Sequence, residues 1–433
     1  MDFTDIYNSK KKSPEEIADQ ILSGFELVCP TAASQPTAIP AAIAERAKKG
    51  EIEHVRHNSI IALNPAPFVD PELAGKFEYV SWFTQAAARK GVQEGYCDYM
   101  PCHYSEEVAV WDAKGNPDVF YAVVSPMDRH GYFSFGIIAS EAVELAERAK
   151  YVFLEVNKNM PRCHGSNIIH ISQVDALCEY DAPLNEVPVP TVSETDLTIG
   201  RQIAEMIPDG ATIQFGIGGV PSAVGMCLND KKDLGIHTEL FTESMIDLIE
   251  QGIVTNRRKP LNTGKTVAAF AWGSKRMYDF LDDNISISME PVSYVNNPYV
   301  IGQIDNFISI NACLEVDLLG QVCSESIGPK HFSGSGGQVD FVRGCNMSKG
   351  GKSFIAMNAT AKKGTLSKIK PILTPGAVVT TGKNDVDYIV TEFGVAHLRG
   401  RTAGERAKAL IEIAHPDFRE ELRAEARKMH LMI

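Results

Sequence analysis

The sequence has no long apolar run and no excess of basic residues, and its first residues do not predict a signal peptide. No stretch of its 433 residues approaches the roughly 18 consecutive apolar residues of a membrane-spanning helix. Three lysines near the start are followed by a polar helix start, Ser13-Pro14-Glu15-Glu16, instead of an apolar segment. A formal net charge of −13 argues against nucleic acid as a partner, because phosphate contacts need a basic surface. We therefore expect a cytoplasmic protein that binds neither nucleic acid nor membranes.

The nine cysteines are scattered along the chain, and none forms a C-x-x-C pair. Cys102-His103 and Cys163-His164 come closest to metal-ligand spacing, but each lacks a second pair of ligands. We expect buried, reduced thiols and no metal site.

The chain alternates helical and β-rich segments, which is typical of parallel sheets with helices on both faces. Its length exceeds what one core usually supports, so two domains are expected. The two halves also resemble each other. Ser-capped helix starts lead to Gly24 and to Gly210, each followed by a short strand, and a D-x-x-G turn recurs at Asp128 and at Asp317.

Similar spacing of two different signatures favours an internal duplication. The Pro-rich segment DAPLNEVPVPT, residues 181–191, is the expected boundary. We predict an N-terminal domain over residues 1–185 and a C-terminal domain over 191–433 that carries the chemistry. A ligand is expected in the cleft between two such domains.

The most informative stretch is residues 211–241. A strand over 211–215 leads into a GIGG loop, a helix is expected to start near Ser222, and a second strand over 235–241 carries Glu239. A glycine loop before a helix presents backbone N–H groups to an anion or a polarised carbonyl oxygen. A second glycine-rich loop, FSGSGGQVDF, follows at 332–341. Together with Glu239 as nucleophile or base, these loops indicate an enzyme acting on an acyl group.

Two alternatives bear on this site. GIGG is not the dinucleotide fingerprint G-x-G-x-x-G, because its third glycine directly follows the second. Glu243 is a rival carboxylate four residues after Glu239. Its neighbours Thr242 and Ser244 favour a helix start for Glu243, so Glu239 is the preferred assignment.

Several motifs occur in one order along nearly the whole chain: GIGGVP (216–221), DLGIHTELF (233–241), YVNNP (294–298), LEVDLLG (314–320), FSGSGGQVDFVRG (332–344) and VTEFGVAHLRG (390–400). In these motifs the sequence resembles the acetyl-CoA hydrolase/transferase family of class I CoA-transferases, nearest its 4-hydroxybutyrate and butyrate branch. The resemblance implies two duplicated ribose-5-phosphate-isomerase-like α/β domains, mainly parallel sheets flanked by helices, with a catalytic glutamate on the second. The succinyl-CoA:3-oxoacid branch has S-E-N-G around that glutamate, and this chain does not.

The resemblance also implies roles for single residues. Glu239 of HTEL matches the nucleophile, and the loop Gly216, Ile217, Gly218, Gly219 and Val220 would lie along coenzyme A. Leu314 matches a CoA-contacting position, and Gly337 matches a glycine whose amide faces the acyl oxygen. Asn296 resembles an asparagine that lines the site, and Glu392 one that helps to order it.

The implied reaction transfers CoA between an acyl-CoA and a short-chain carboxylate, acetate with butyrate or 4-hydroxybutyrate, through a glutamyl-CoA thioester. Coenzyme A is then a substrate, and no permanently bound cofactor is expected. The alternatives are an acyl-CoA hydrolase, a non-catalytic CoA or nucleotide binder, and a sugar-phosphate isomerase. The expected assembly is a homodimer or a higher homo-oligomer.

Overall fold

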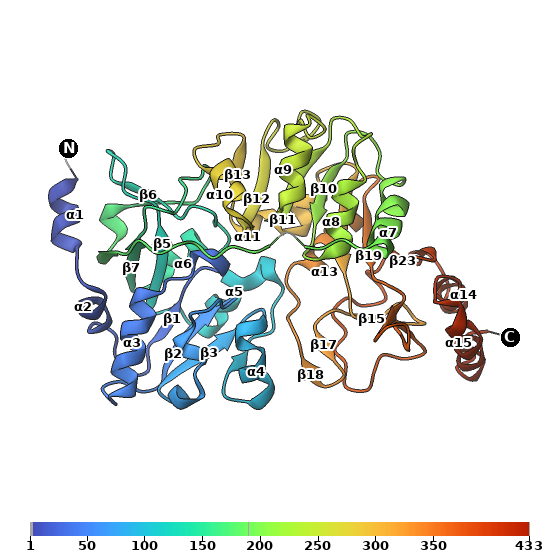
Figure 1. The fold of residues 1–433 in the computed structure, drawn as a ribbon, viewed down its shortest axis with the longest axis horizontal. Coiled ribbons are helices and arrows are strands. Elements are labelled where there is room, and N and C mark those ends of the chain that lie inside the picture. Colours follow the sequence, from blue (N-terminus) through green and yellow to red (C-terminus); the bar gives the residue numbers. More distant parts are fainter. Residues whose placement is uncertain (1–2, 189, 433) are drawn as a thin grey trace. The chain divides into compact units, whose positions relative to one another are not determined.

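The computed structural model describes residues 3–188 and 190–432, and Figure 1 labels its helices and strands. The chain forms two compact units. The first unit contains the chain up to Pro188 together with Val267–Tyr294. The second unit contains the segment that ends at Thr266 and the segment that begins at Val295. The predicted division into residues 1–185 and 191–433 stays a prediction. Within the described residues, no helix combines the length and apolar character needed to cross a membrane.

The first unit is built on a seven-stranded sheet in the order β4-β3-β2-β1-β5-β7-β9. Every neighbouring pair of these strands is parallel. Strand β5, VFYAVV, is buried at all of its residues, as expected for a central strand covered on both faces. The sheet strands are β1 (Glu26–Val28), β2 (Val55–Ser59), β3 (Phe77–Ser81), β4 (Asp98–Tyr99), β5 (Val119–Val124), β7 (Tyr151–Val156) and β9 (Ala176–Glu179).

The remaining elements of this unit lie outside that sheet. Strands β6 (Tyr132–Ser134) and β8 (Ile168–His170) form a separate antiparallel pair. The helices are α1 (Thr4–Lys10), α2 (Pro14–Ala18), α3 (Ala38–Lys48), α4 (Ala86–Glu94), α5 (Glu107–Lys114) and α6 (Ala142–Arg148). Later in the chain come β12 (Thr266–Ala271), α10 (Lys275–Leu281), β13 (Ile287–Met289) and α11 (Val292–Val295).

The second unit contains the neighbouring strands β11-β10-β14-β19-β23-β24. All of these pairs are parallel except the last, in which β24 turns back on β23. The strands are β10 (Thr212–Phe215), β11 (Gly235–Phe241), β14 (Phe307–Ala312), β19 (Lys352–Ala356), β23 (Tyr388–Thr391) and β24 (Gly394–His397). The helices are α7 (Glu194–Ala204), α8 (Gly219–Met226), α9 (Glu243–Glu250), α12 (Pro298–Ile301), α13 (Gln338–Met347), α14 (Ala403–Glu412) and α15 (Pro416–Lys428).

Short strands between β14 and β23 complete this unit. They are β15 (Glu315–Asp317), β16 (Val322–Cys323), β17 (Ser326–Ile327), β18 (Lys330–His331), β20 (Thr360–Ala361), β21 (Leu366–Ser367) and β22 (Ile369–Lys370). A hydrophobic core joins β15, β16 and β22 to helices α14 and α15, which are drawn in red in Figure 1.

The two sheets repeat one strand order. The series β2-β1-β5-β7-β9 in the first unit corresponds to β11-β10-β14-β19-β23 in the second. A capping box precedes β1 and another precedes β10, formed by Ser13 with Glu16 and by Ser193 with Asp196. Gly24 and Gly210 both have positive φ, 82° and 77°, which a glycine adopts easily. The predicted α/β class with parallel sheets is therefore confirmed, and the shared strand order supports the duplication.

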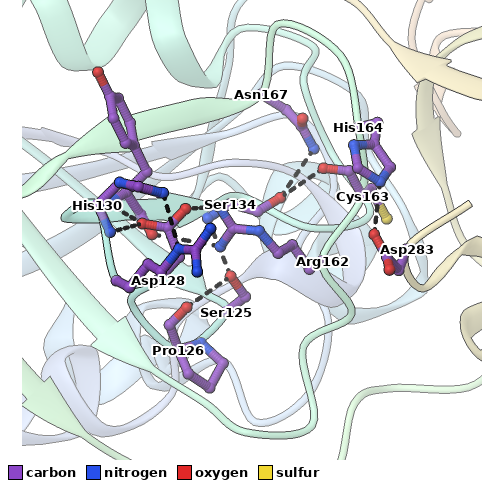
Figure 2. Close-up of polar contacts among 12 residues, drawn as sticks. Ser125, Pro126, Asp128, His130, Ser134, Arg162, Cys163, His164, Asn167 and Asp283 are labelled. Carbon is purple, nitrogen blue, oxygen red and sulfur yellow. Dashed lines mark hydrogen bonds and ion pairs between the residues drawn. The ribbon is translucent and has the colours of Figure 1, made fainter. Parts of the chain in front are cut away.

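The two D-x-x-G turns are also built alike. Asp128 Oδ1 accepts the N–H groups of His130 and Tyr132 at 2.8 and 2.9 Å, and Figure 2 shows Arg162 bound to the same carboxylate. Asp317 Oδ1 accepts the corresponding N–H groups, two and four residues on, at 3.0 and 2.8 Å. The glycine that closes each turn has φ of 84° or 85°. The aspartate thus organises the same turn twice in one chain.

Helix α8, which follows β10, begins earlier than the sequence analysis predicted. A helix start was expected near Ser222, but α8 begins at Gly219; its counterpart after β1, helix α3, begins at Ala38. In both helices a proline, Pro40 or Pro221, occupies the third helical position. Proline is tolerated there because the first N–H groups of a helix have no partner within it.

The N-termini of these two helices are satisfied differently. Glu155 on β7 accepts the N–H groups of Thr37 and Ile39 at the start of α3, at 3.0 and 2.6 Å. Burial raises the pKa of Glu155 to about 7 despite these bonds. At α8 the N-cap residue is Gly218, no side chain of the described residues caps the helix, and β19 (KSFIA) contains no carboxylate. The Asp196 carboxylate lies near this helix start, since a Cβ atom built on Gly219 would be 2.9 Å from its Oδ2, but the hydrogen bonds described for it are to Ser193. Among the described residues, a carboxylate therefore hydrogen bonds to the helix N-terminus at α3 and not at α8.

Candidate active site

Glu239 lies near the end of β11, in the strand that the sequence predicts over 235–241. Every other residue of β11 is buried, whereas Glu239 keeps partial contact with solvent. Strand β11 pairs with β10, the strand that leads into the glycine loop. A carboxylate at this position combines a rigid backbone with an accessible side chain, as a nucleophile requires.

Two donors converge on the Glu239 carboxylate. Asn296 donates from Nδ2 to Glu239 Oε2 at 2.7 Å, and the backbone N–H of Gly337 also hydrogen bonds to the carboxylate. Burial raises the pKa of Glu239 to about 7, the charge of Asp340 raises it further, and the two hydrogen bonds oppose this rise. The structure therefore brings together three residues that the sequence analysis placed in one site.

Asn296 is fully buried in the turn between α11 and α12. The next residue, Asn297, caps α12 by accepting the N–H of Tyr299 at 2.9 Å. Pro298 occupies the first helical position, where its missing N–H costs nothing. The motif YVNNP therefore has a local explanation: one asparagine starts a helix and the other points at Glu239.

Any side chain at position 337 would collide with Glu239 and Asn296 unless they moved. A Cβ atom built on Gly337 would lie 2.0 Å from Glu239 Oε2 and 2.2 Å from Asn296 Nδ2. Its φ of −94° is open to any residue, so close approach and not backbone strain is the constraint. Gly337 is also the N-cap residue of α13, whose N-terminus favours negative charge nearby.

Gln338, the first residue of α13, fixes this helix start, and the sequence analysis missed it. Its Nε2 donates to Ala312 O at 2.8 Å, at the end of β14, and its Oε1 accepts from Ser324 and Thr381 at 2.9 and 3.0 Å. The sequence feature that could have identified Gln338 is its position directly after GSGG, and the structure shows that this polar residue is buried. Gln338 thereby holds the Gly337 amide in place relative to the sheet.

The GIGG loop leaves β10 and rises into α8. Gly218 has φ of 131°, and Ile217 is 48% exposed, so the loop presents both backbone and an apolar side chain to solvent. Below it, a Cβ on Gly216 would lie 2.6 Å from Asn311 Oδ1. The described contacts of residues 216–220 are with the scaffold and not with Glu239, so their expected role along CoA stays a prediction.

A buried polar network supports this loop and was also missed. Gln214 Oε1 accepts from Ser309 Oγ at 2.7 Å, and Asn311 Nδ2 donates to Ser309 Oγ at 2.9 Å. These polar residues interrupt the apolar pattern of β10 (TIQF) and β14 (FISINA), which was the signal in the sequence. The network joins the ends of two strands at the point where the strand order reverses, a common ligand position in such sheets.

Leu314 and Glu392 make contacts with the scaffold. The Leu314 N–H donates to Cys323 O at 2.9 Å, and Glu392 Oε2 accepts the N–H of Ala359 at 2.8 Å. Glu392 lies in the turn between β23 and β24, and its backbone oxygen accepts from Gln202. Their roles in contacting CoA and in ordering the site stay predictions.

The rival carboxylate, Glu243, is the first residue of α9. This agrees with its interpretation as a helix-starting residue, although Thr242, the N-cap, makes no side-chain capping bond. Among the residues that the structure describes, no group of three or more metal-ligating side chains is arranged to hold a metal ion. The arrangement at Glu239 offers a carboxylate nucleophile with two aimed donors, which suits acyl transfer.

Comparisons with known proteins agree with this chemistry. Residues 1–193 match the acetyl-CoA hydrolase/transferase N-terminal domain, and residues 273–426 match the C-terminal domain of the same family. A succinyl-CoA:cyclohexane-1-carboxylate CoA transferase from Geobacter metallireducens is 49% identical over 98% of this chain and 96% of its own. A 4-hydroxybutyrate coenzyme A transferase from Clostridium kluyveri is 43% identical over 99% of this chain and 100% of its own. The crystal structure of RipA from Yersinia pestis matches with a TM-score of 0.95 and 42% identity over 100% of both chains.

Proposed function

The chain belongs to the acetyl-CoA hydrolase/transferase family and is a CoA-transferase, and from this premise we propose that it transfers CoA through Glu239. One observation carries the proposal: the Glu239 carboxylate, on a rigid strand, faces the Asn296 amide and the Gly337 N–H. Because position 337 has no side chain, the backbone N–H of Gly337 can approach this carboxylate closely.

The first half-reaction begins with attack of a Glu239 oxygen on the thioester carbonyl carbon. The C–S bond breaks, CoA leaves as thiolate, and an acyl–glutamyl anhydride remains. The thiolate then attacks the glutamyl carbonyl, which expels the substrate acid as carboxylate and leaves a glutamyl-CoA thioester. No electron is gained or lost overall, so the reaction needs no oxidant or reductant.

The second half-reaction runs the same steps backwards with another carboxylate. That carboxylate attacks the glutamyl thioester, thiolate leaves, and its return to the new acyl group frees Glu239. Each addition passes through a tetrahedral oxyanion. The Asn296 and Gly337 donors are placed beside the reacting carboxyl to stabilise such charge, and one such donor is worth on the order of 3 kcal/mol.

A pKa of about 7 for Glu239 suits its role as the attacking group. The carboxylate must be ionised to attack, and a more basic carboxylate is a stronger nucleophile. The proposal therefore predicts that activity falls as the pH drops below neutral, because protonated Glu239 cannot form the anhydride.

For substrates, we propose acetyl-CoA with butyrate or 4-hydroxybutyrate. The 43%-identical relative, named for 4-hydroxybutyrate, supports this choice. The 49%-identical relative is named for succinyl-CoA and cyclohexane-1-carboxylate, so both belong in the substrate panel. We also propose a cytoplasmic homodimer or higher homo-oligomer, which light scattering of the purified protein would test.

The decisive experiment is a mass spectrum of the protein after mixing with acetyl-CoA and no acceptor. A covalent CoA adduct should appear and map to the peptide that contains Glu239. Borohydride reduction of that thioester should inactivate the enzyme permanently. An adduct on another residue, or none in a protein that still transfers CoA, would overturn the proposal.

A further inference from the structure

We propose that His237 is a positioning residue that holds Asn296 and the start of α13 against Glu239. This inference rests on the proposed function of Glu239, because a positioning role has meaning only if Glu239 reacts. It is carried by hydrogen bonds and ring contacts that all lie within the second unit.

His237 lies two residues before Glu239 in β11, so both side chains are on the same face of the sheet. It is fully buried, and its Nε2 lies 2.7 Å from the backbone oxygen of Val295. A carbonyl oxygen can only accept, so Nε2 carries the proton and donates it. His237 therefore fixes the backbone oxygen of the residue that precedes Asn296.

Asn296 is thus held from both sides. Before it, the Val295 carbonyl is bound by His237, and Val295 itself is fully buried. After it, Asn297 caps α12. Between these two anchors the Asn296 side chain has little freedom, which keeps its Nδ2 at 2.7 Å from Glu239 Oε2. The His237 bond is one of the two anchors that aim this donor.

A second path leads from the His237 ring to the other donor. His237 meets Phe307 edge to face with centroids 5.9 Å apart, and Phe307 stacks on Phe341 at 6.0 Å. Phe341 belongs to the first turn of α13, and its N–H donates to Gly337 O at 3.1 Å. One buried ring therefore contacts both the segment that carries Asn296 and, through Phe307, the helix start that carries Gly337.

His237 acts as a fixed donor and not as a proton carrier. Burial, together with the charge of Lys259, lowers the pKa of His237 to about 3, so the ring stays neutral at working pH. Lys259 is itself buried and donates to Ile236 O and Lys265 O at 2.8 and 2.7 Å. Burial lowers the pKa of Lys259 to about 7. On the other side, the charged group acting on Glu239 is Asp340.

Loss of the His237 donor has a defined consequence for Glu239. The buried Val295 oxygen would lose its partner, and the turn would relax to find another. A misaimed Asn296 stabilises the ionised carboxylate less, so the pKa of Glu239 should rise above its present value of about 7. The acidic limb of the kcat/KM–pH profile, which reports ionisation of the free enzyme, should then move to higher pH.

The test compares His237→Leu with His237→Gln. Leucine keeps the volume but removes the donor, whereas the glutamine amide can place an N–H near the position of Nε2. We expect His237→Leu to shift the acidic limb up by about half a pH unit or more and to lower kcat at pH 7 about tenfold, with KM little changed. His237→Gln should restore most of both. If His237→Leu does not fold, His237→Asn replaces it, because its shorter amide cannot reach Val295 O.

A matched control is His57→Leu. His57 lies in strand β2 of the first unit and is also fully buried, and burial lowers its pKa to about 3. Its ring stacks on that of Phe68. Its replacement should lower the melting temperature without moving the acidic limb. An acidic limb and kcat that are unchanged in folded His237→Leu, or a glutamine variant no better than leucine, would overturn the inference.

Glu239→Gln separates this failure from failure of the proposed function. If Glu239→Gln still transfers CoA, the nucleophile assignment is wrong. If Glu239→Gln is inactive and forms no adduct while His237→Leu behaves like the unmodified chain, only the role of His237 is wrong.

Discussion

Asn296 and Glu239 are joined by a hydrogen bond of 2.7 Å, and the same two side chains fill the space beside Gly337. A Cβ atom at position 337 would overlap Glu239 Oε2 and Asn296 Nδ2, at 2.0 and 2.2 Å. Both of these atoms are at the ends of side chains that can move. The backbone amide of Gly337 is thus close enough to act on the reacting carboxyl only because position 337 has no side chain.

Gly337→Ala should therefore damage catalysis more than folding. The methyl group would displace the Glu239 carboxylate and the Asn296 amide, and kcat should fall about a hundredfold, as for loss of one oxyanion donor, with a modest change in KM. Gly382→Ala is the matched control, since nothing lies within 4 Å of a Cβ built there and its φ is not positive. A Gly337→Ala enzyme with normal kcat would show that close approach at this glycine is irrelevant to the reaction.

The two neighbouring carboxylates should respond very differently to neutralisation. Glu239→Gln should abolish transfer, because an amide cannot form the anhydride. Glu243→Gln should cost about 0.3–1 kcal/mol of stability, since Glu243 opens α9 and interacts favourably with the helix N-terminus. Steady-state transfer rates and thermal melting of both variants measure this contrast. The reverse order of activities would move the nucleophile to Glu243.

Glu239 should make the stability of the protein depend on pH. Its pKa is raised from 4.5 to about 7 in the folded state, so folding favours its protonated form. This contribution is fully present below the unfolded pKa and is lost as the pH rises through about 7. Glu239→Gln removes the titration and should be more stable than the unmodified chain at pH 8, by about 1–3 kcal/mol, with the difference disappearing near pH 4. Chemical denaturation at the two pH values measures it, and equal differences at both would contradict the raised pKa.

Transfer and hydrolysis share the glutamyl-CoA intermediate, so Glu239 variants cannot separate them. The outcome depends on whether water or a carboxylate reaches the intermediate first. We expect acetyl-CoA to be consumed far more slowly without an acceptor than with butyrate or 4-hydroxybutyrate, and the product to be the matching acyl-CoA. Chromatography of the CoA species measures both. Rapid release of free CoA that ignores added carboxylate would identify a hydrolase.

The local structure around the site could be predicted from the sequence because its signals are local. The β-rich runs over 211–215 and 235–241 predicted β10 and β11, and the Ser193 cap predicted the start of α7. The start of α8 was predicted three residues late, because Pro221 was taken for the beginning of the helix and not for a residue of its first turn. The sequence pattern alone does not separate these two positions, since both lack an N–H requirement.

The contacts that make the site could not be predicted from local pattern. Asn296 and Gly337 meet Glu239 only after strand β11, the turn between α11 and α12 and the start of α13 are packed together, and no periodicity encodes these contacts. Their assignment came from family resemblance. Gln338 and the Gln214–Asn311 network were missed. A polar residue in an apolar segment indicates that its side chain has a hydrogen-bond partner when buried, but the sequence does not identify that partner.

The carboxylate of Glu155 has a consequence for stoichiometry. A chain with two similar halves has two glycine- or proline-marked helix starts, and each could in principle attract the same anionic group. Because Glu155 is part of the chain, its carboxylate has a high effective concentration at the start of α3. A dissolved anion therefore does not displace it. At α8 no side chain of the described residues caps the helix, and the nearby Asp196 carboxylate hydrogen bonds to Ser193, so we expect a dissolved anion to bind at this helix start. We therefore expect one anion-binding helix start in the chain although the architecture is duplicated. Calorimetric titration should give one CoA bound per chain and not two.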